Sequence, residues 1–90
     1  MRFGWDVNKA ASNLQKHGVS FEEASSVFFD LLGISGDDPD HSIGERRYVV
    51  FGMSSRERLL IVSYTERDGD IRSLSARTTT RAERVLYEEG

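Results

Sequence analysis

The fold of this 90-residue chain is decided by residues 59–78, LLIVSYTERDGDIRSLSART. Two runs of β-branched, aromatic and aliphatic residues flank the dipeptide Asp68-Gly69. Such a dipeptide between strand-like runs is the strongest short-range signal for a β-hairpin closed by a two-residue turn. The sequence therefore predicts an antiparallel pair of strands over residues 59–67 and 70–78.

A two-residue type I′ turn also predicts which residues lie opposite one another. The expected pairs, counted from the turn, are Arg67 with Asp70, Thr65 with Arg72, Tyr64 with Ser73, Val62 with Ser75 and Leu60 with Arg77. In this register one face of the sheet carries Tyr64, Ser73, Ser75 and Arg77, while the other carries Arg72, Leu74 and Ala76. Small hydroxyl residues around an arginine leave room for a phosphate, so the first face is predicted to be an open polar shelf.

The remaining elements extend this hairpin into an α+β domain. Residues 46–53 form a further strand-like run, and residues 2–5 and 32–35 could add short strands. Apolar residues with helical spacing predict two helices before residue 30 and one after residue 80. We expect one domain over residues 1–90, with two N-terminal helices, an antiparallel meander of three to four strands and a C-terminal helix.

Two capping boxes mark the starts of the second and the last helix. In each, Ser20 or Thr80 is followed three residues later by a glutamate, Glu23 or Glu83. The hydroxyl accepts a hydrogen bond from the first turn and the glutamate reaches back to the cap, which satisfies two backbone groups. Both glutamates are therefore expected to cap helices and to lie outside any functional site.

Composition removes several classes of protein from consideration. The chain has no cysteine, which excludes disulfides and thiolate metal sites. Its apolar runs are too short for a membrane span and no secretory leader is expected, so we expect a cytoplasmic protein without membrane contact. Residues 37–41 hold three aspartates and a histidine, but their Asp- and Pro-containing setting is typical of a solvated loop. No metal or other cofactor is therefore expected.

The charge is unevenly distributed along the chain. The formal net charge is −3, yet ten of the twelve cationic residues are arginine. Residues 1–40 carry three cations and seven anions, whereas residues 41–90 carry nine arginines and eight anions. Arginine is favoured where bidentate contact with a phosphate or carboxylate matters. The charge thus argues against coating of nucleic acid by bulk electrostatics and favours a local phosphate-binding site.

RNA is the substrate that such a site suits best. An RNA phosphodiester carries its own nucleophile, the 2′-hydroxyl, so its cleavage needs a base, cations around the phosphorus and a proton for the leaving oxygen, but no metal. The predicted catalytic residues are Arg77, Arg72 and Arg67, with Glu45 or His41 as the base. The predicted substrate-binding residues are Tyr64, Ser75, Arg46, Lys9 and Lys16.

Several of these residues also have a structural interpretation. Arg72 can lie at a strand edge beside Asp70, and Arg77 can pair with Glu45, Glu57 or a helix C-terminus. Glu45 can equally be an ion-pair partner of an arginine. Solvation is the usual interpretation of the helix face shared by Lys9, Asn13 and Lys16.

An ordered series of short motifs resembles one known family. The most specific are Lys16-His17-Gly18-Val19-Ser20-Phe21-Glu22-Glu23-Ala24 and Ile71-Arg72-Ser73-Leu74-Ser75-Ala76-Arg77. The others, in chain order, are Trp5-Asp6, Glu45-Arg46-Arg47-Tyr48, Tyr64-Thr65-Glu66-Arg67 and Glu83-Arg84. Over about residues 3–88, the chain resembles the BrnT family of toxins from bacterial type II toxin-antitoxin systems.

The resemblance implies a RelE-like fold and a ribonuclease that inhibits translation by cleaving RNA. It also implies a cognate BrnA-type antitoxin, a small DNA-binding protein that joins the toxin in a higher-order complex. The antitoxin then supplies the DNA contacts by which the pair represses its own promoter. Val7 departs from the family, in which many members have proline, and residues 33–40 are irregular, but neither departure touches the arginines.

Two other functions remain open at this point. One is a non-catalytic, toxin-like binding module that only forms an autorepressing complex with its antitoxin, which the acidic net charge and small core favour. The other is RNA binding without cleavage, which would show a salt-dependent affinity and no products.

Overall fold

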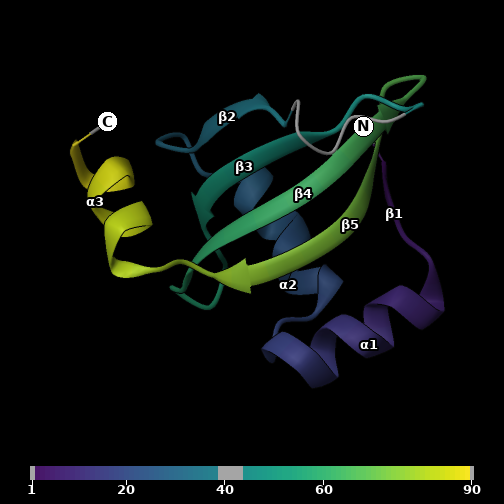
Figure 1. Ribbon diagram of the computed structural model, residues 1–90, viewed down its shortest axis with the longest axis horizontal. Coiled ribbons are helices and arrows are strands. Elements are labelled where there is room, and N and C mark those ends of the chain that lie inside the picture. The colour runs from purple at the N-terminus through teal and green to yellow at the C-terminus, as the bar shows by residue number, and fades with distance from the viewer. Residues whose placement is uncertain (1, 39–43, 90) are drawn as a thin grey trace.

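The computed structural model describes residues 2–38 and 44–89, which form three helices and one sheet (Figure 1). The elements in chain order are β1 (Phe3–Gly4), α1 (Val7–His17), α2 (Phe21–Ser26), the 3₁₀ turn η1 (Val27–Phe29), β2 (Ile34–Asp37), β3 (Tyr48–Met53), β4 (Leu59–Arg67), β5 (Asp70–Thr78) and α3 (Arg81–Glu89). The predicted α+β class, the two N-terminal helices and the C-terminal helix are confirmed. The prediction of three to four strands is wrong, because the sheet has five, in the order β1-β5-β4-β3-β2.

The two outermost strands account for this difference. β1 pairs in parallel with the start of β5, which makes the sheet mixed, and β2 pairs antiparallel with β3. Both overlap the possible short strands at residues 2–5 and 32–35. They are only two and four residues long, so alternation alone could not establish that both join the sheet.

Local signals explain the ends of α1 and the central turn. α1 begins after Asp6, whose side chain accepts hydrogen bonds from two backbone N–H groups of the first turn. It ends at Gly18, which adopts the left-handed conformation with a φ of 68°. Asp68 and Gly69 both have positive φ, 52° and 84°, as a type I′ turn requires. The predicted hairpin turn is therefore confirmed.

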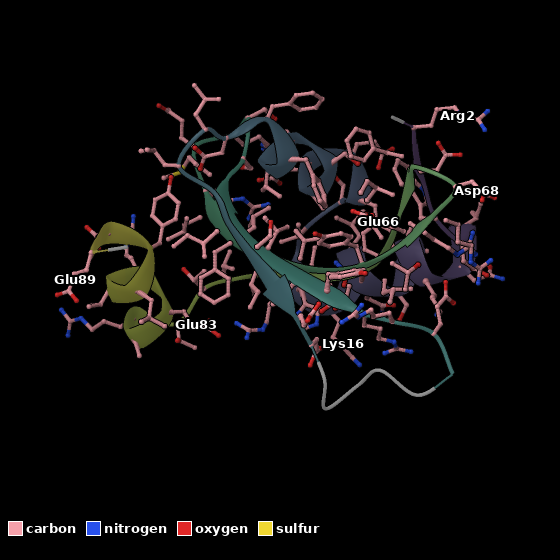
Figure 2. The ribbon with its side chains drawn as sticks, turned by 90° about the horizontal axis from the view of Figure 1, so that it is seen from above. Arg2, Lys16, Glu66, Asp68, Glu83 and Glu89 are labelled. Carbon is pink, nitrogen blue, oxygen red and sulfur yellow. The ribbon has the colours of Figure 1, made fainter. Side chains whose placement is uncertain are left out.

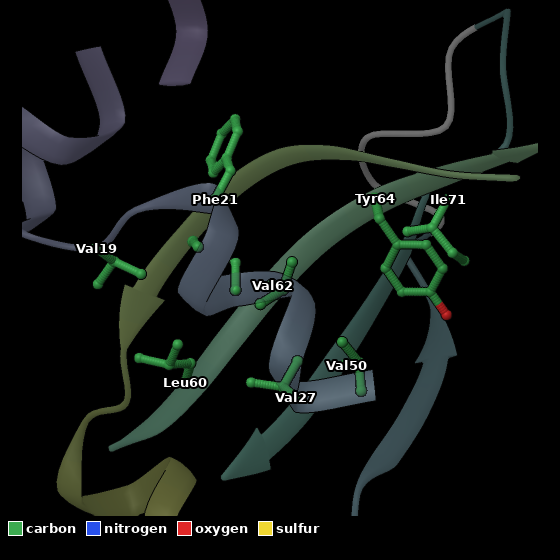
Figure 3. Packing of buried hydrophobic residues seen from close by; sticks show 10 residues of the cluster. Val19, Phe21, Val27, Val50, Leu60, Val62, Tyr64 and Ile71 are labelled. Carbon is green, nitrogen blue, oxygen red and sulfur yellow. The ribbon is translucent and has the colours of Figure 1, made fainter. Parts of the chain in front are cut away.

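The hydrophobic core lies between the sheet and the layer formed by α2 and η1, which lies behind the strands in Figure 1. η1 approaches β3 so closely that a Cβ atom at Gly52 would lie 3.0 Å from the Cβ and the carbonyl oxygen of Val27. Figure 3 shows the packing of the buried side chains in this core. The buried cluster comprises Val19, Phe21, Ala24, Val27, Val50, Leu60, Val62, Tyr64, Ile71 and Ala76. The opposite face of the sheet is called the outer face below.

A buried asparagine attaches α1 to β5. Asn13 Nδ2 donates to the carbonyl oxygens of Val19 and Ala76, both at 2.9 Å, and Asn13 Oδ1 accepts from Ala76 N at 3.0 Å. The carboxamide thereby satisfies backbone groups of β5 beyond the short stretch that β1 pairs. The interpretation of Asn13 as part of a solvated face with Lys9 and Lys16 is wrong, since Asn13 fixes the position of α1.

The two capping boxes differ in the structure. At α3, Thr80 N donates to Glu83 Oε1 at 2.8 Å and Glu83 N donates to Thr80 Oγ1 at 3.3 Å, which is the predicted reciprocal arrangement. At α2, Ser20 Oγ accepts from Glu23 N at 3.0 Å as expected. The carboxylate of Glu23 does not return to the cap, so that half of the prediction is wrong.

The carboxylate of Glu23 instead forms a buried ion pair with Arg58 in the connection between β3 and β4. Arg58 Nε donates to Glu23 Oε2 at 3.0 Å, and Arg58 Nη2 donates to Glu23 Oε1 and to the carbonyl oxygen of Gly18. Ser54 Oγ donates to Glu23 Oε2 at 2.7 Å. These hydrogen bonds, led by that of Arg58, lower the pKa of Glu23 despite its burial. One arginine thus connects both N-terminal helices to the sheet.

A β-bulge in β5 changes the register of the central hairpin. From the turn as far as Tyr64 opposite Ser73, the predicted pairs are present. Beyond that point Leu74 is an extra residue, and the pairs become Ser63 with Ser75, Val62 with Ala76, Ile61 with Arg77 and Leu60 with Thr78. The predicted pairs Val62 with Ser75 and Leu60 with Arg77 are therefore wrong.

α3 follows β5 and lies at the opposite end of the sheet from α1 (Figure 1). Within the described part of the chain, no helix is long and apolar enough to cross a membrane.

Candidate functional site

The β-bulge decides which side chains share the outer face. Uninterrupted alternation along β5 would place Arg72 and Arg77 on opposite faces of the sheet. Because Leu74 is an extra residue, alternation restarts at Ser75, and Arg72, Ser75 and Arg77 all face outward. Burial agrees, since the core-facing residues of β5 are Ile71, Ser73 and Ala76. The bulge therefore gathers three predicted site residues on one face.

Tyr64 lies on the other face, in the core, with only 5% of its surface exposed. Its ring stacks on Tyr48 with a centroid distance of 5.5 Å and meets Phe28 edge-on at 4.9 Å. Burial raises the pKa of its hydroxyl. The prediction that Tyr64 shares a polar shelf with Ser75 and Arg77 is therefore wrong, and Tyr64 is a packing residue.

A cationic groove runs between α1 and the outer face of β5. It consists of two adjoining hollows of about 230 and 280 Å³ that share Lys9, Leu74 and Ser75 in their lining. We call it the α1–β5 groove; its charged lining residues are Lys9, Lys16, Arg47 and the acidic Asp38, and the others are Ser12, Asn13, His17, Ser63, Leu74 and Ser75. The structure thus brings three of the predicted substrate-binding residues, Lys9, Lys16 and Ser75, around one concave surface.

The other seven residues of this lining were not predicted as site residues: Ser12, Asn13, His17, Asp38, Arg47, Ser63 and Leu74. His17 follows Lys9 by eight residues and therefore lies on the same side of α1, a spacing that the sequence does show. Leu74 reaches the groove because of the bulge, which hydrophobic periodicity does not reveal. Ser63 faces outward by ordinary alternation, since its neighbours Val62 and Tyr64 lie in the core.

The predicted residues Arg67, Arg72 and Glu45 gather near the hairpin turn. Arg67 Nε and Nη2 donate to the two carboxylate oxygens of Glu45, each at 2.8 Å. This bidentate pair lowers the pKa of Glu45, and the charge of Arg72 contributes in the same direction. Among the described residues the side chain of Arg72 forms no hydrogen bond or ion pair, so its guanidinium remains available to a phosphate.

Arg77, at the other end of β5, is engaged by the first turn of α3. Its Nη1 and Nη2 donate to Glu83 Oε1 and Oε2, each at 2.8 Å, and Nη1 also donates to the carbonyl oxygen of Thr78 at 3.2 Å. Arg77 lowers the pKa of Glu83 to about 2, with a further contribution from Thr80 N. The acidic partner is thus Glu83, and neither Glu45 nor Glu57. Figure 2 shows the spread of the charged groups, with Glu83 at one end of the molecule and Arg2 and Asp68 at the other.

Arg46 is a further predicted site residue that lies outside the α1–β5 groove. Arg46 Nη2 lies 3.4 Å from Asp37 Oδ2 at the β2 edge of the sheet, and both side chains are exposed. His41, the second candidate for the base, lies outside the described residues. The possible metal ligands Asp37 and Asp38 are described, and within residues 2–38 and 44–89 no three histidine, aspartate or glutamate residues lie close enough to hold a metal ion.

The fold and the groove define a small α+β domain that presents cations on an uncovered sheet face beside a lysine-bearing helix. A family model for the ribonuclease toxin BrnT of type II toxin-antitoxin systems matches residues 5–83. The chain belongs to this BrnT family, as its motifs predict, and an antitoxin is the partner that such a family implies.

A solved structure agrees with this assignment. The crystal structure of the Brucella abortus ribonuclease toxin, BrnT, is similar to this chain with a TM-score of 0.66. The similarity covers 90% of this chain and 99% of that one, at 18% sequence identity, which shows a shared fold. No curated protein sequence matches the chain.

Proposed function

We propose that this chain is an endoribonuclease toxin that binds single RNA strands across the outer face and cleaves them without a metal ion. The observation that carries the proposal is the bulge at Leu74, which places Arg72, Ser75 and Arg77 on one face beside the lysines of α1. Bulges are common next to active sites because they redirect side chains without disturbing the rest of a sheet.

The proposed reaction uses the 2′-hydroxyl of the RNA as the nucleophile. Glu45 removes the proton of that hydroxyl, O2′ attacks the phosphorus, and the bond from phosphorus to O5′ breaks as O5′ takes up a proton. The products are a 2′,3′-cyclic phosphate and a 5′-hydroxyl. Arg72, beside Glu45, stabilises the negative charge that develops on the phosphoryl oxygens, while Lys9, Lys16 and, at the other end of β5, Arg77 hold neighbouring phosphates of the RNA backbone.

The ion pair with Arg67 supports Glu45 as the base in one respect and restricts it in another. It orients the carboxylate beside Arg72 and keeps it deprotonated at neutral pH, because the pKa is lowered. A lowered pKa also makes the carboxylate a weaker base. Arg67 is therefore proposed as a positioning residue, and at least one of its two hydrogen bonds to Glu45 must break when RNA binds.

The family supports the biological setting that we propose. A BrnA-type antitoxin would neutralise this toxin in the cytoplasm, assemble with it into a higher-order complex and supply the DNA contacts for autorepression. The excess of anions in residues 1–40 suits a basic, DNA-binding partner. Cleavage of RNA by the free toxin would inhibit translation.

Removing both lysines from the groove tests where the RNA lies. The double variant Lys9→Ala, Lys16→Ala is expected to bind single-stranded RNA about tenfold more weakly. The slope of log Kd against the logarithm of the salt concentration is expected to fall by about 1.4, because each phosphate contact on a single strand contributes about 0.7 to it. Fluorescence anisotropy with a labelled oligonucleotide over a salt series measures both quantities.

The matched control is Lys9→Arg, Lys16→Arg, which keeps both charges and should bind RNA like the parent. An unchanged salt dependence in the alanine variant would place the RNA elsewhere. Salt-dependent RNA binding by the parent without products would favour the alternative of RNA binding without cleavage.

A further inference from the structure

α3 is attached to the rest of the domain mainly through polar contacts. None of its residues is buried, and its apolar side chains Val85 and Leu86 remain 44% and 61% exposed. Near its start Glu83 holds Arg77, and near its end Tyr87 Oη donates to Asp30 Oδ2 at 2.6 Å. A helix held by two polar contacts and little apolar burial separates from its domain at small free-energy cost.

The first of these contacts occupies the face of Arg77 that a phosphate would need. Both terminal nitrogens of the guanidinium donate to the carboxylate of Glu83, so the bidentate geometry that suits a phosphate is already filled by another oxyanion. An RNA phosphate and Glu83 therefore compete for the same two donors. The Nε–H and the second N–H of Nη2 have no hydrogen-bond partner among the described residues, but the carboxylate of Glu83 repels a phosphate at that edge too, so phosphate binding is strengthened when Glu83 leaves.

The apolar contacts of α3 point to the same conclusion. Leu86 lines a groove of about 400 Å³ together with Ile34, Val49 and Phe51 of the outer face. Phe51 lies opposite Ile61, and Ile61 lies opposite Arg77, so this groove lies on the same cross-strand row of the outer face as Arg77. Displacement of α3 would release Arg77 and uncover this apolar surface at the same time.

From these contacts we propose that α3 is an autoinhibitory latch. In the closed state Glu83 pairs with Arg77; an RNA phosphate displaces Glu83 from Arg77, and α3 then moves away from the sheet. The inference rests on the proposed function, because it names what controls one of its phosphate-binding arginines. In the closed state Arg77 is paired with Glu83, while Arg72 and the lysines of α1 remain available to RNA. The affinity for RNA is then lowered in proportion to the fraction of open molecules.

Glu83→Gln separates the latch from the helix cap. A glutamine at this position of a capping box still accepts from Thr80 N, so the start of α3 is preserved, whereas the charge that holds Arg77 is lost. The expected result is about three- to tenfold tighter binding of a 2′-O-methyl RNA oligonucleotide, which cannot be cleaved, because a partly exposed ion pair no longer competes. Amide hydrogen exchange in residues 82–89 should become faster at the same time.

Two further variants serve as controls. Glu88→Gln removes a carboxylate from the same helix, where it lies 3.9 Å from Arg84 at the surface, and should change neither measurement. Tyr87→Phe releases the far end of α3 while leaving Arg77 paired, so exchange should rise with a smaller gain in RNA affinity.

The outcomes separate this inference from the proposed function. Addition of the oligonucleotide to the parent protein should accelerate exchange in α3. If RNA binds but Glu83→Gln weakens binding or leaves exchange unchanged, Glu83 positions Arg77 and the latch is wrong. If no variant binds RNA, both the latch and the proposed function are wrong.

Discussion

Arg72→Ala is expected to reduce kcat/KM for RNA cleavage by about 10²- to 10³-fold, because a preorganised donor to the developing charge is worth about 3 to 4 kcal/mol in a transition state. Arg72 is the arginine on the outer face whose side chain has no hydrogen-bond partner among the described residues, so its full guanidinium can contact the phosphate. Cleavage of a labelled oligonucleotide under single-turnover conditions measures the effect.

Two comparisons keep this result interpretable. Arg56→Ala removes an exposed arginine from the connection between β3 and β4 and should cleave RNA at the parental rate. Arg72→Lys keeps the charge but loses the planar fork, so it should recover only part of the activity. The melting temperature of Arg72→Ala should match that of the parent, since the side chain is exposed. Parental cleavage by a folded Arg72→Ala variant would remove Arg72 from the site.

Arg58→Ala is expected to lower the free energy of unfolding by about 2 to 4 kcal/mol. Removal of one partner from a buried ion pair costs about 3 to 5 kcal/mol, and the figure is reduced here because Arg58 is about one-third exposed while Glu23 is 3% exposed. A domain of this size has a total stability of about 5 to 13 kcal/mol, so the loss is large. Urea denaturation followed by circular dichroism measures it, and Arg56→Ala should change it by less than about 0.5 kcal/mol.

The pH dependence of this loss identifies its cause. Glu23 has a lowered pKa in the folded parent, so its stabilising contribution is present above the ordinary pKa of 4.5 and disappears as the pH falls through the folded value. In the variant without Arg58, protonation of the same buried carboxylate removes its unpaired charge and so stabilises the folded state. The difference between parent and variant should therefore narrow between pH 7 and pH 4. A difference independent of pH would mean that lost packing, and not the unpaired carboxylate, is responsible.

The central hairpin shows how far sequence reasoning reached. Asp68-Gly69 identified the turn and its type, because positive φ at both positions is a strictly local requirement. The pairing was also predicted correctly up to Tyr64 and Ser73. It failed at Leu74, since the surrounding residues are small or moderately apolar and tolerate either face, so that periodicity carries no information on a bulge.

That failure had a functional consequence. Uninterrupted alternation separated Arg72 from Ser75 and Arg77, whereas the bulge unites them and leaves Tyr64 in the core. The partner of Glu23 was missed for a different reason. Glu23 meets Arg58, 35 residues away, and a contact between distant segments depends on the packing of the whole domain.

The chemical identity of the RNA ends tests the central claim most directly. Expression of the parent chain without its antitoxin in a bacterial host, followed by analysis of the cellular RNA, reports on cleavage whether or not ribosomes take part. We expect new fragments that end in a 2′,3′-cyclic phosphate or 3′-phosphate and begin with a 5′-hydroxyl, together with arrested growth. Arg72→Ala should show neither. Fragments with 3′-hydroxyl and 5′-phosphate ends, or intact RNA in cells that make the folded parent, would contradict it.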